Sequence, residues 1–319
     1  MLLHAGMLLA GGVLLYFGAE WLVRGSVGLA RAMGVRPIVI GLTVVAYGTS
    51  APELVVSIVS AVEGKSAIAL GNVIGSNVAN LGLILGLSAL ISPPRVDPHL
   101  VLREIPVLLA SALLLPLVLH DNVISRVDGA GLVAGAGAFT WFTLRSAKSI
   151  PAAAPIRQEA REEVEAEAAP GKPSTLVLIA VAGLFGLILG GKLFVDAASG
   201  FARALGMSER LVGLTIVAVG TSLPEMAASM VAALRGHSAI AIGNVIGSNI
   251  FNILLILGGA SVIAPIKSSL GPIAVDAALL LGITAIAALM MFGNRRISRL
   301  EGAILVICYA GFIAAAALA

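Results

Sequence analysis

Cysteine, aromatic residues and charged residues are all scarce in this sequence. Cys308 is the only cysteine, which excludes an internal disulfide and indicates no particular compartment. Only 12% of the residues are charged and 4% are aromatic, whereas 59% are hydrophobic and the mean hydropathy is +1.05. Soluble domains carry about 25% charged residues. The composition therefore excludes an ordinary soluble protein and predicts an integral membrane protein.

Long polar segments are nearly absent as well. The chain contains ten apolar stretches, each long enough for a helix that crosses ~30 Å of hydrocarbon. They lie near residues 5–30, 39–62, 66–91, 100–119, 128–146, 175–203, 211–234, 238–263, 271–292 and 300–318. The one long polar stretch, 149–174, is rich in Pro, Ala and Glu and is expected to be a solvated linker. We therefore expect an all-α membrane protein with ten transmembrane helices.

The small basic excess, a net charge of +3 with a pI of about 9.3, indicates membrane topology. The basic residues lie in short loops, so nucleic acid is not an expected partner. With the N-terminus outside, fourteen of the twenty Lys and Arg residues fall on the inner side. We predict a multi-pass protein of the inner or plasma membrane, with both termini outside and the linker in the cytoplasm. The N-terminal apolar stretch lacks a basic leader and is expected to be a span, not a signal peptide.

The sequence repeats itself at a fixed distance of 172 residues. The segment Gly48–Glu53 (GTSAPE) returns as Gly220–Glu225 (GTSLPE). The segment Gly71–Asn77 (GNVIGSN) returns unchanged as Gly243–Asn249. A register kept without a gap over two helices indicates an internal duplication.

The duplication divides the chain into a first repeat of five helices (1–148), the linker (149–174) and a second repeat of five helices (175–319). An odd number of spans makes the second copy enter the membrane from the opposite side, so the repeats are inverted. Inverted repeats are typical of secondary transporters, whose binding site lies between the repeats near the midplane. Two inverted halves can also line a channel, which stays an alternative.

The first copy places an acid beside a helix break. Pro52 has no N–H, so the carbonyl of Gly48 loses its helical partner. Such carbonyls are tolerated in a membrane only where they face a cavity or a ligand. Thr49 and Ser50 precede Glu53 by four and three residues, so their hydroxyls and the carboxylate are expected on one side of the break.

Thr221, Ser222 and Glu225 repeat this arrangement in the second copy. An ionised carboxylate in the bilayer is costly, by several kcal/mol on insertion scales. A bound cation would supply the missing charge for Glu53 and Glu225. The alternative is a protonated or salt-bridged structural acid, which two symmetric positions make less attractive.

Polar residues line one face of the following helix in each copy, because they recur at every fourth position. These are Asn72, Ser76 and Asn80 in the first copy, and Asn244, Ser248 and Asn252 in the second. We interpret Asn72 and Asn244 as bonds between helices and the other four as cation ligands. Hard oxygens without His or Cys favour calcium or sodium over zinc, copper and iron.

With these motifs the chain resembles the cation/calcium antiporter superfamily, specifically its prokaryotic sodium/calcium exchanger branch, over essentially its whole length. The resemblance implies the ten-helix exchanger fold, four cation sites in a central cluster, and sliding of the first and sixth helices during transport. It assigns cation ligation to the backbone carbonyls of Ala46 and Ala218 and to the side chains of Thr49, Ser50, Glu53, Ser76, Asn80, Thr221, Ser222, Glu225, Ser248 and Asn252.

The resemblance also ranks the transported ions. Some members carry Asp where this chain has Asn252, and potassium-dependent members also use an Asp in this motif, so Asn at both Asn80 and Asn252 argues against potassium dependence. Calcium/proton exchangers usually show Gly-Asn-Ala-x-Glu in place of Gly-Thr-Ser-x-Pro-Glu, and that motif is absent here. We therefore predict a secondary active antiporter that exchanges sodium for calcium. Calcium/proton exchange, potassium-dependent exchange, a passive cation channel and a non-transporting scaffold are the alternatives.

Nothing in the sequence indicates an enzyme, since it has no nucleotide motif and no nucleophile with a partner base. The expected partners are sodium, calcium and the lipid bilayer, with no resident cofactor, and we expect the protein to function as a monomer. A further pattern is a pair of opposite charges four residues apart: Glu20 with Arg24, and Lys192 with Asp196 at the matching positions. This spacing predicts an ion pair within each helix, and snorkelling of the separate charges to the membrane interface without pairing is the alternative.

Overall fold

The computed structural model describes residues 2–96, 98–147, 172–207, 218–294 and 296–318. The first half forms α1 (Leu2–Ala32), α2 (Pro37–Ile40), η1 (Gly41–Val45), α3 (Ala46–Thr49), α4 (Ala51–Val62), α5 (Ser66–Val78), η2 (Ala79–Ile84), α6 (Leu85–Ile91), α7 (Pro98–Val118), β1 (Val123–Ile124) and α8 (Arg126–Ala147). The second half forms α10 (Pro173–Ala204), α12 (Ala218–Gly220), α13 (Leu223–Leu234), α14 (Ser238–Phe251), η4 (Asn252–Leu257), α15 (Gly258–Ile263), β2 (Ile266–Lys267), α16 (Leu270–Asn294) and α17 (Arg299–Leu318). The η segments are π-helical.

The described residues are almost all helical, as the composition predicts, because a chain in hydrocarbon must satisfy its backbone hydrogen bonds internally. Among the described residues, six helical stretches are long and apolar enough to cross a membrane, and a seventh joins them if Pro37–Thr49 and Ala51–Val62 form one broken span. Helices lie in all ten predicted stretches, although residues 211–217 of the seventh fall outside the described residues. The count of ten membrane-crossing helices stays a prediction.

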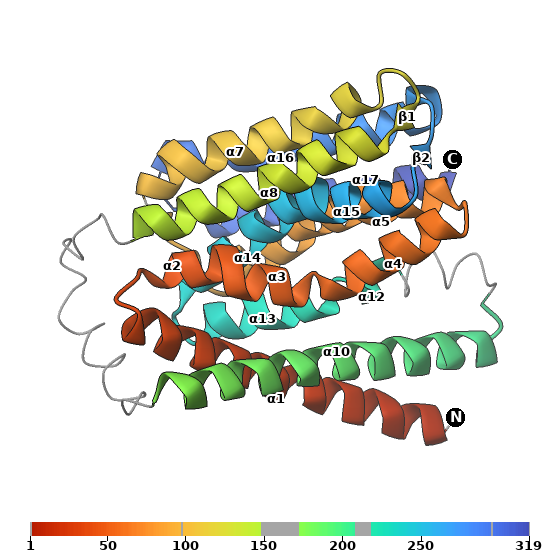
Figure 1. Ribbon diagram of the computed structural model, residues 1–319. Coiled ribbons are helices and arrows are strands. Elements are labelled where there is room, and N and C mark those ends of the chain that lie inside the picture. Colours follow the sequence, from red (N-terminus) through yellow and green to blue (C-terminus); the bar gives the residue numbers. More distant parts are fainter. Residues whose placement is uncertain (1, 97, 148–171, 208–217, 295, 319) are drawn as a thin grey trace.

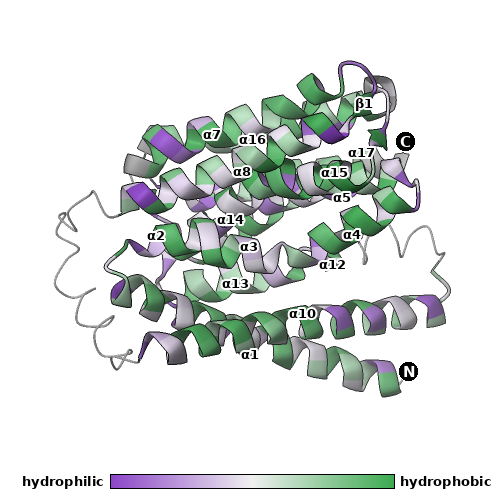
Figure 2. Cartoon of the chain, in the orientation of Figure 1, coloured by the Kyte–Doolittle hydropathy of each residue, from purple (hydrophilic) through white to green (hydrophobic). Residues whose placement is uncertain are grey.

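Figure 1 shows the helices running roughly side by side in one bundle. Both chain ends lie at one end of the bundle, whereas α8 ends and α10 begins at the other. The short strands β1 and β2 pair antiparallel, with Val123 opposite Lys267. Most residues along the helices are apolar in Figure 2, as expected of helices in a bilayer.

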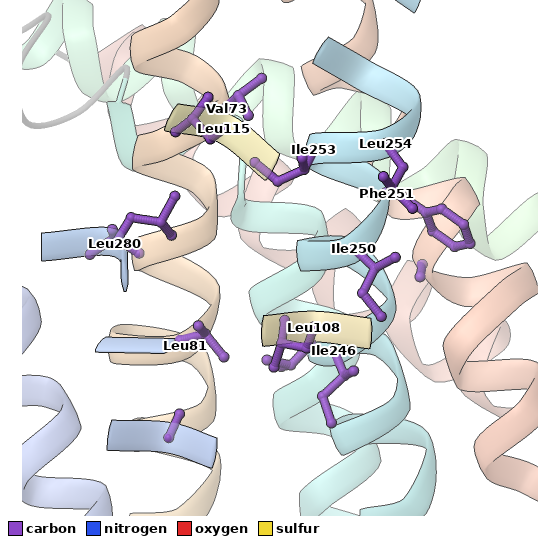
Figure 3. Packing of buried hydrophobic residues seen from close by; sticks show 14 of the residues in the cluster. Val73, Leu81, Leu108, Leu115, Ile246, Ile250, Phe251, Ile253, Leu254 and Leu280 are labelled. Atoms are coloured by element: carbon purple, nitrogen blue, oxygen red, sulfur yellow. The ribbon is translucent and has the colours of Figure 1, made fainter. Parts of the chain in front are cut away.

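The two polar-motif helices are the most buried of the long helices. Within the most apolar window of each stretch, 94% of Ser238–Ile263 and 72% of Ser66–Ile91 is buried, compared with 33% for α1 and for α10. Large apolar side chains fill the space around them: Figure 3 shows Leu108 of α7 near Ile246 of α14, and Leu81 and Leu280 belong to the same buried cluster. The motif residues are therefore held by a packed core.

Helices α1 and α10 form a separate layer on one face of this core (Figure 1). They pack together through glycines, because a Cβ on Gly18 would lie 2.7 Å from the Leu187 backbone nitrogen and 2.8 Å from the Gly183 carbonyl oxygen. Such small-residue contacts let helix backbones approach closely in membranes. Gly243 and Gly247 of the second motif helix likewise lie against Ile38–Ala46.

The predicted ion pair between Glu20 and Arg24 is wrong. Glu20 accepts two bonds from Arg235 at the end of α13, with Nη2 to Oε1 at 2.9 Å and Nε to Oε2 at 3.0 Å. Arg235 presents a planar fork that matches both carboxylate oxygens, which a short intrahelical contact does not offer. Likewise, Lys192 and Asp196 form no ion pair with each other in the described chain.

Candidate functional site

Both acidic motifs lie where a helix is interrupted. The segment Pro37–Thr49 meets α4 at an angle of 45°, with Ser50 at φ −83° and ψ 7° between them. Ser222 has nearly the same backbone angles, φ −87° and ψ 8°, before α13. The predicted break at Pro52 is thus confirmed, and the second copy repeats its geometry.

The two motif glutamates are fully enclosed. Glu53 and Glu225 are each 1% exposed and lie in the first turn of α4 and α13. A carboxylate near a helix N-terminus gains about 0.3–1 kcal/mol from the helix dipole, up to ~2 kcal/mol when partly buried. The cost of burying a charge is still several kcal/mol after relaxation. The helix ends alone therefore do not stabilise two ionised carboxylates here.

No Lys or Arg side chain is buried anywhere in the described chain. The salt-bridged alternative for Glu53 and Glu225 therefore lacks a buried partner among those residues. Each carboxylate instead accepts a hydroxyl bond from the opposite repeat: Ser50 Oγ donates to Glu225 Oε1 at 2.9 Å, and Ser222 Oγ donates to Glu53 Oε1 at 3.3 Å. These bonds cross between the two copies, so the site joins the two repeats.

The serine of the first motif helix also reaches this centre. Ser222 Oγ lies 3.4 Å from Ser76 Oγ, so it can donate to that hydroxyl as an alternative to Glu53. Thr49 Oγ1 lies 3.1 Å from the Val45 carbonyl oxygen and 3.2 Å from Asn244 Oδ1, and it donates to one or the other. All four of these polar side chains are buried: Thr49, Ser76, Ser222 and Asn244.

Asn72 and Asn244 join helices, as the sequence predicts. The Asn72 Nδ2 group donates to the Glu53 carbonyl at 3.1 Å and to Ser57 Oγ at 2.9 Å. Asn244 makes the equivalent pair, to the Glu225 carbonyl at 3.4 Å and to a serine hydroxyl at 2.9 Å. These bonds fix each glutamate backbone against the following helix, and the two copies do so in the same way.

The other two asparagines lie in π-helical turns. Asn80 is the second residue of η2, and Asn252 is the first of η4. A π segment widens a helix locally and is frequent at functional sites. Asn252 Nδ2 donates to Asn77 Oδ1 at 3.1 Å across the repeats, with both residues buried.

Six of the ten predicted side-chain ligands carry a buried oxygen with no hydrogen-bond partner. These atoms are Oε2 of Glu53, Oδ1 of Asn80, Oγ1 of Thr221, Oε2 of Glu225, Oγ of Ser248 and Oδ1 of Asn252. Buried polar atoms are almost always paired, and each unpaired one costs about 1–3 kcal/mol. These six oxygens come from both repeats, and they are hard ligands of the kind that Ca²⁺ and Na⁺ prefer.

The predicted backbone ligands differ between the copies. The Ala46 carbonyl accepts the Ser50 N–H at 3.1 Å, which leaves one lone pair of that oxygen for another partner. In the second copy, the Ser222 N–H donates to the Val219 carbonyl at 3.2 Å. Ala218 is the first residue of α12.

No group of three or more His, Cys, Asp and Glu side chains capable of holding a metal occurs in the described ranges. The site therefore has two carboxylates, supplemented by hydroxyls and amides. Sequence reasoning missed Asn77, which contacts Asn252, and Ser57, which contacts Asn72. Asn77 is the last residue of the repeated GNVIGSN motif, and this was the one signal that marked it.

The chain is similar to known proteins over nearly its whole length. A family profile described as sodium/calcium exchanger protein matches residues 3–145 and 175–318. The protein CaxA of Alkalimonas amylolytica is 39% identical over 316 residues, which cover 98% of both chains. Sodium/calcium exchanger MaX1 of Methanosarcina acetivorans is 31% identical over 337 residues, 96% of both chains. A solved structure of the sodium-calcium exchanger NCX_Mj matches with a TM-score of 0.83 and 33% identity, over 98% of each chain.

Proposed function

The chain belongs to the sodium/calcium exchanger family, and on that premise we propose that it is a secondary active antiporter that exchanges sodium for calcium across the membrane by alternating access. The observation that carries the proposal is the pair of glutamates, each 1% exposed and with no buried basic partner in the described chain. The sodium/calcium exchanger MaX1 and the exchanger NCX_Mj, which are similar over nearly the whole chain, support the choice of ions.

We assign cation ligation to the site oxygens of both repeats. The set consists of the carbonyls of Ala46 and Ala218 and the side chains of Thr49, Ser50, Glu53, Ser76, Asn80, Thr221, Ser222, Glu225, Ser248 and Asn252. Support comes from the six unpaired oxygens and from the crossed bonds between Ser and Glu of opposite repeats. The exchanged ions are substrates, and we propose no resident cofactor.

The charge of this set explains exchange in place of leak. Two carboxylates carry about −2, which one Ca²⁺ or two Na⁺ ions neutralise. Without cations the buried charges are uncompensated, so the enclosed conformation through which the site changes sides is costly. Either cation set removes that cost, and differential stabilisation of the conformations by each ligand drives the cycle.

The proposed architecture is ten transmembrane helices in two inverted repeats, 1–148 and 175–319, joined by a cytoplasmic linker (149–174). It is supported by the position of both chain ends at one end of the bundle, with the end of α8 and the start of α10 at the other (Figure 1). We propose an inner or plasma membrane protein with both termini outside, working as a monomer. Residues 149–171 of the linker fall outside the described residues.

The test is calcium uptake by sodium-loaded liposomes that contain the purified protein. Uptake that requires an outward sodium gradient is expected. Replacing internal sodium with potassium, or with a pH gradient, separates the potassium-dependent and proton-coupled alternatives. A passive channel would admit calcium without any counter-ion, and a scaffold would admit none, so either result would reject the antiporter.

A further inference from the structure

We infer that Asn77 is a positioning residue that orients the Asn252 amide toward the transported cation, an inference that rests on the proposed function. The side-chain amide of asparagine has an acceptor oxygen on one side and a donor NH₂ group on the other. Only the oxygen can bind a cation. Some acceptor must therefore hold the NH₂ group away from the site.

Asn77 supplies that acceptor. Asn252 Nδ2 donates to Asn77 Oδ1 at 3.1 Å, while Asn252 Oδ1 is buried and has no partner. Asn77 is 2% exposed and comes from the opposite repeat, on α5, directly after the proposed ligand Ser76. One amide is thus turned by the other, and the free oxygen is left for the ion.

The copies are not equivalent at this point. The counterpart of Asn77 is Asn249, whose Nδ2 donates to the Val245 carbonyl of its own helix at 2.7 Å. The counterpart pair, Asn249 with Asn80, forms no hydrogen bond in the described structure, and both Oδ1 atoms are unpaired. Orientation of a ligand by a residue behind it typically changes metal affinity 10- to 100-fold.

The experiment is equilibrium calcium binding to the purified full-length protein and to Asn77→Leu, Asn252→Ala and the double variant. Asn77→Leu keeps the side-chain size and removes the acceptor, and a loss of about 10-fold in calcium affinity is expected. Because Asn77 acts through Asn252, the double variant should bind as Asn252→Ala does. Ser111→Ala, which removes a buried hydroxyl that donates within α7, is the control and should bind normally.

Two results would overturn the inference: unchanged affinity of Asn77→Leu, or losses that add up in the double variant, as a merely structural role predicts. If Asn77→Leu is not monodisperse, Asn77→Ser takes its place, because its hydroxyl is too short to reach the Asn252 amide. Should the unmodified protein bind no calcium, the proposed function itself fails. Normal wild-type binding with no coupling removes only the role of Asn77.

An independent observation concerns the ion pair between Glu20 and Arg235. At the repeat distance of 172 residues, Glu20 corresponds to Lys192 and Glu63 corresponds to Arg235. Both positions therefore carry opposite charges in the two copies. The pair seen in the structure joins the first helix of one repeat to the second broken helix of the other.

The matching pair is apart in this structure. Helix α1 packs along α13, whereas α10 makes no comparable packing with α4, both helices being fully described. Lys192 is exposed, and Glu63 is bonded to Lys65 at 2.7 Å. Of these two symmetry-related ion pairs, the described structure therefore contains Glu20–Arg235 but not Lys192–Glu63.

We propose that alternating access exchanges these contacts, so that the opposite-facing state breaks the Glu20–Arg235 pair and forms a Lys192–Glu63 pair. Inverted repeats allow this exchange, because alternating access moves one repeat against the other around a fixed site and the two pairs occupy matching positions in the repeats. Arg235 donates to both carboxylate oxygens of Glu20, whereas a lysine such as Lys192 would meet Glu63 as a single point charge, so the arginine pair is the stronger of the two. The device thus favours the conformation described here.

Cross-linking tests the exchange directly, in a Cys308→Ala background. The pair Glu63→Cys with Lys192→Cys is expected to cross-link during exchange and to stop it, and Glu20→Cys with Arg235→Cys should trap the present conformation. The charge swap Glu20→Arg with Arg235→Glu should restore a turnover that Glu20→Arg alone changes by about fivefold.

Absence of the Glu63–Lys192 cross-link while calcium exchange proceeds would overturn the proposal. Failure of the charge swap to restore turnover in a monodisperse protein would do so as well. Both results leave the antiport activity itself intact, so they are distinct from failure of the proposed function.

Discussion

Replacing Glu53 with glutamine isolates the charge on which the proposed site depends. The Glu53→Gln side chain keeps an oxygen to accept the Ser222 hydroxyl, and an NH₂ group takes the place of the unpaired Oε2. Shape and burial are retained, while the charge of the site changes from about −2 to −1. Any loss of binding therefore reports the charge and one ligand oxygen.

The size of the effect follows from burial. Removing one member of a buried charge pair costs about 3–5 kcal/mol. Since each 1.4 kcal/mol is tenfold in affinity, calcium binding should weaken by about two to four orders of magnitude. The Coulomb energy is proportional to the ion's charge, so sodium should lose about half as much in free energy. The selectivity of the site should therefore shift toward sodium.

The assay is calcium binding together with thermal unfolding. In the absence of cations Glu53→Gln should be at least as heat-stable as the wild type, because it removes an uncompensated buried charge. Calcium at 100 times its Kd should stabilise the wild type by about 2.7 kcal/mol and the variant far less at the same concentration. Glu104→Gln is the matched control: Glu104 is also buried, but it lies on α7 and interacts with Arg36 and Arg103.

A folded Glu53→Gln protein whose calcium affinity stays within about threefold of the wild type would refute this reasoning, since it would show that the carboxylate contributes under ~1 kcal/mol. A Glu104→Gln protein with the same loss of binding would also refute it. In that case any buried glutamate would do, and the motif position would not matter.

Two further outcomes follow from the described contacts. Ser50→Ala removes the hydroxyl that donates to Glu225 at 2.9 Å, and a hydrogen bond to a charged group is worth about 1.5–3 kcal/mol. Calcium affinity measured by titration should therefore weaken by more than about tenfold, and an unchanged affinity would exclude the crossed pairing. Gly18→Leu places a side chain against the Gly183 and Leu187 backbone, so the α1–α10 layer should separate and the unfolding temperature should fall; Gly12→Leu, which has open space, is the control, and equal stability of the two variants would contradict the packing.

The parts of the fold that repeat in sequence were predictable. Helices occupy the apolar stretches because hydrocarbon leaves the backbone no other partner, and the break at Pro52 follows from its missing donor. The burial of Glu53 and Glu225 was also predictable. Each lies inside an apolar stretch predicted to cross the membrane, where an acidic side chain must face the protein interior because it cannot face lipid. These are local consequences of residue type.

Contacts between the repeats were not predictable. Spacing along one helix places Ser50 near its own glutamate, but it carries no information on Glu225, 175 residues away, to which the hydroxyl donates at 2.9 Å. Glu20 likewise finds Arg235 through the packing of α1 on α13. The π-helical turns at Asn80 and Asn252 leave no periodic signal, because the sequences around them (ANLGLI and NILLIL) are apolar on all sides and show no phase that an extra residue could shift.

The most direct test of the central claim, that cations occupy the paired buried carboxylates in competition, is equilibrium binding of radioactive calcium to the purified protein while sodium is raised. Bound calcium in the wild type should be displaced by sodium, and the double variant Glu53→Gln with Glu225→Gln should bind none. Calcium that stays bound at every sodium concentration, or that still binds to the folded double variant, would contradict the account.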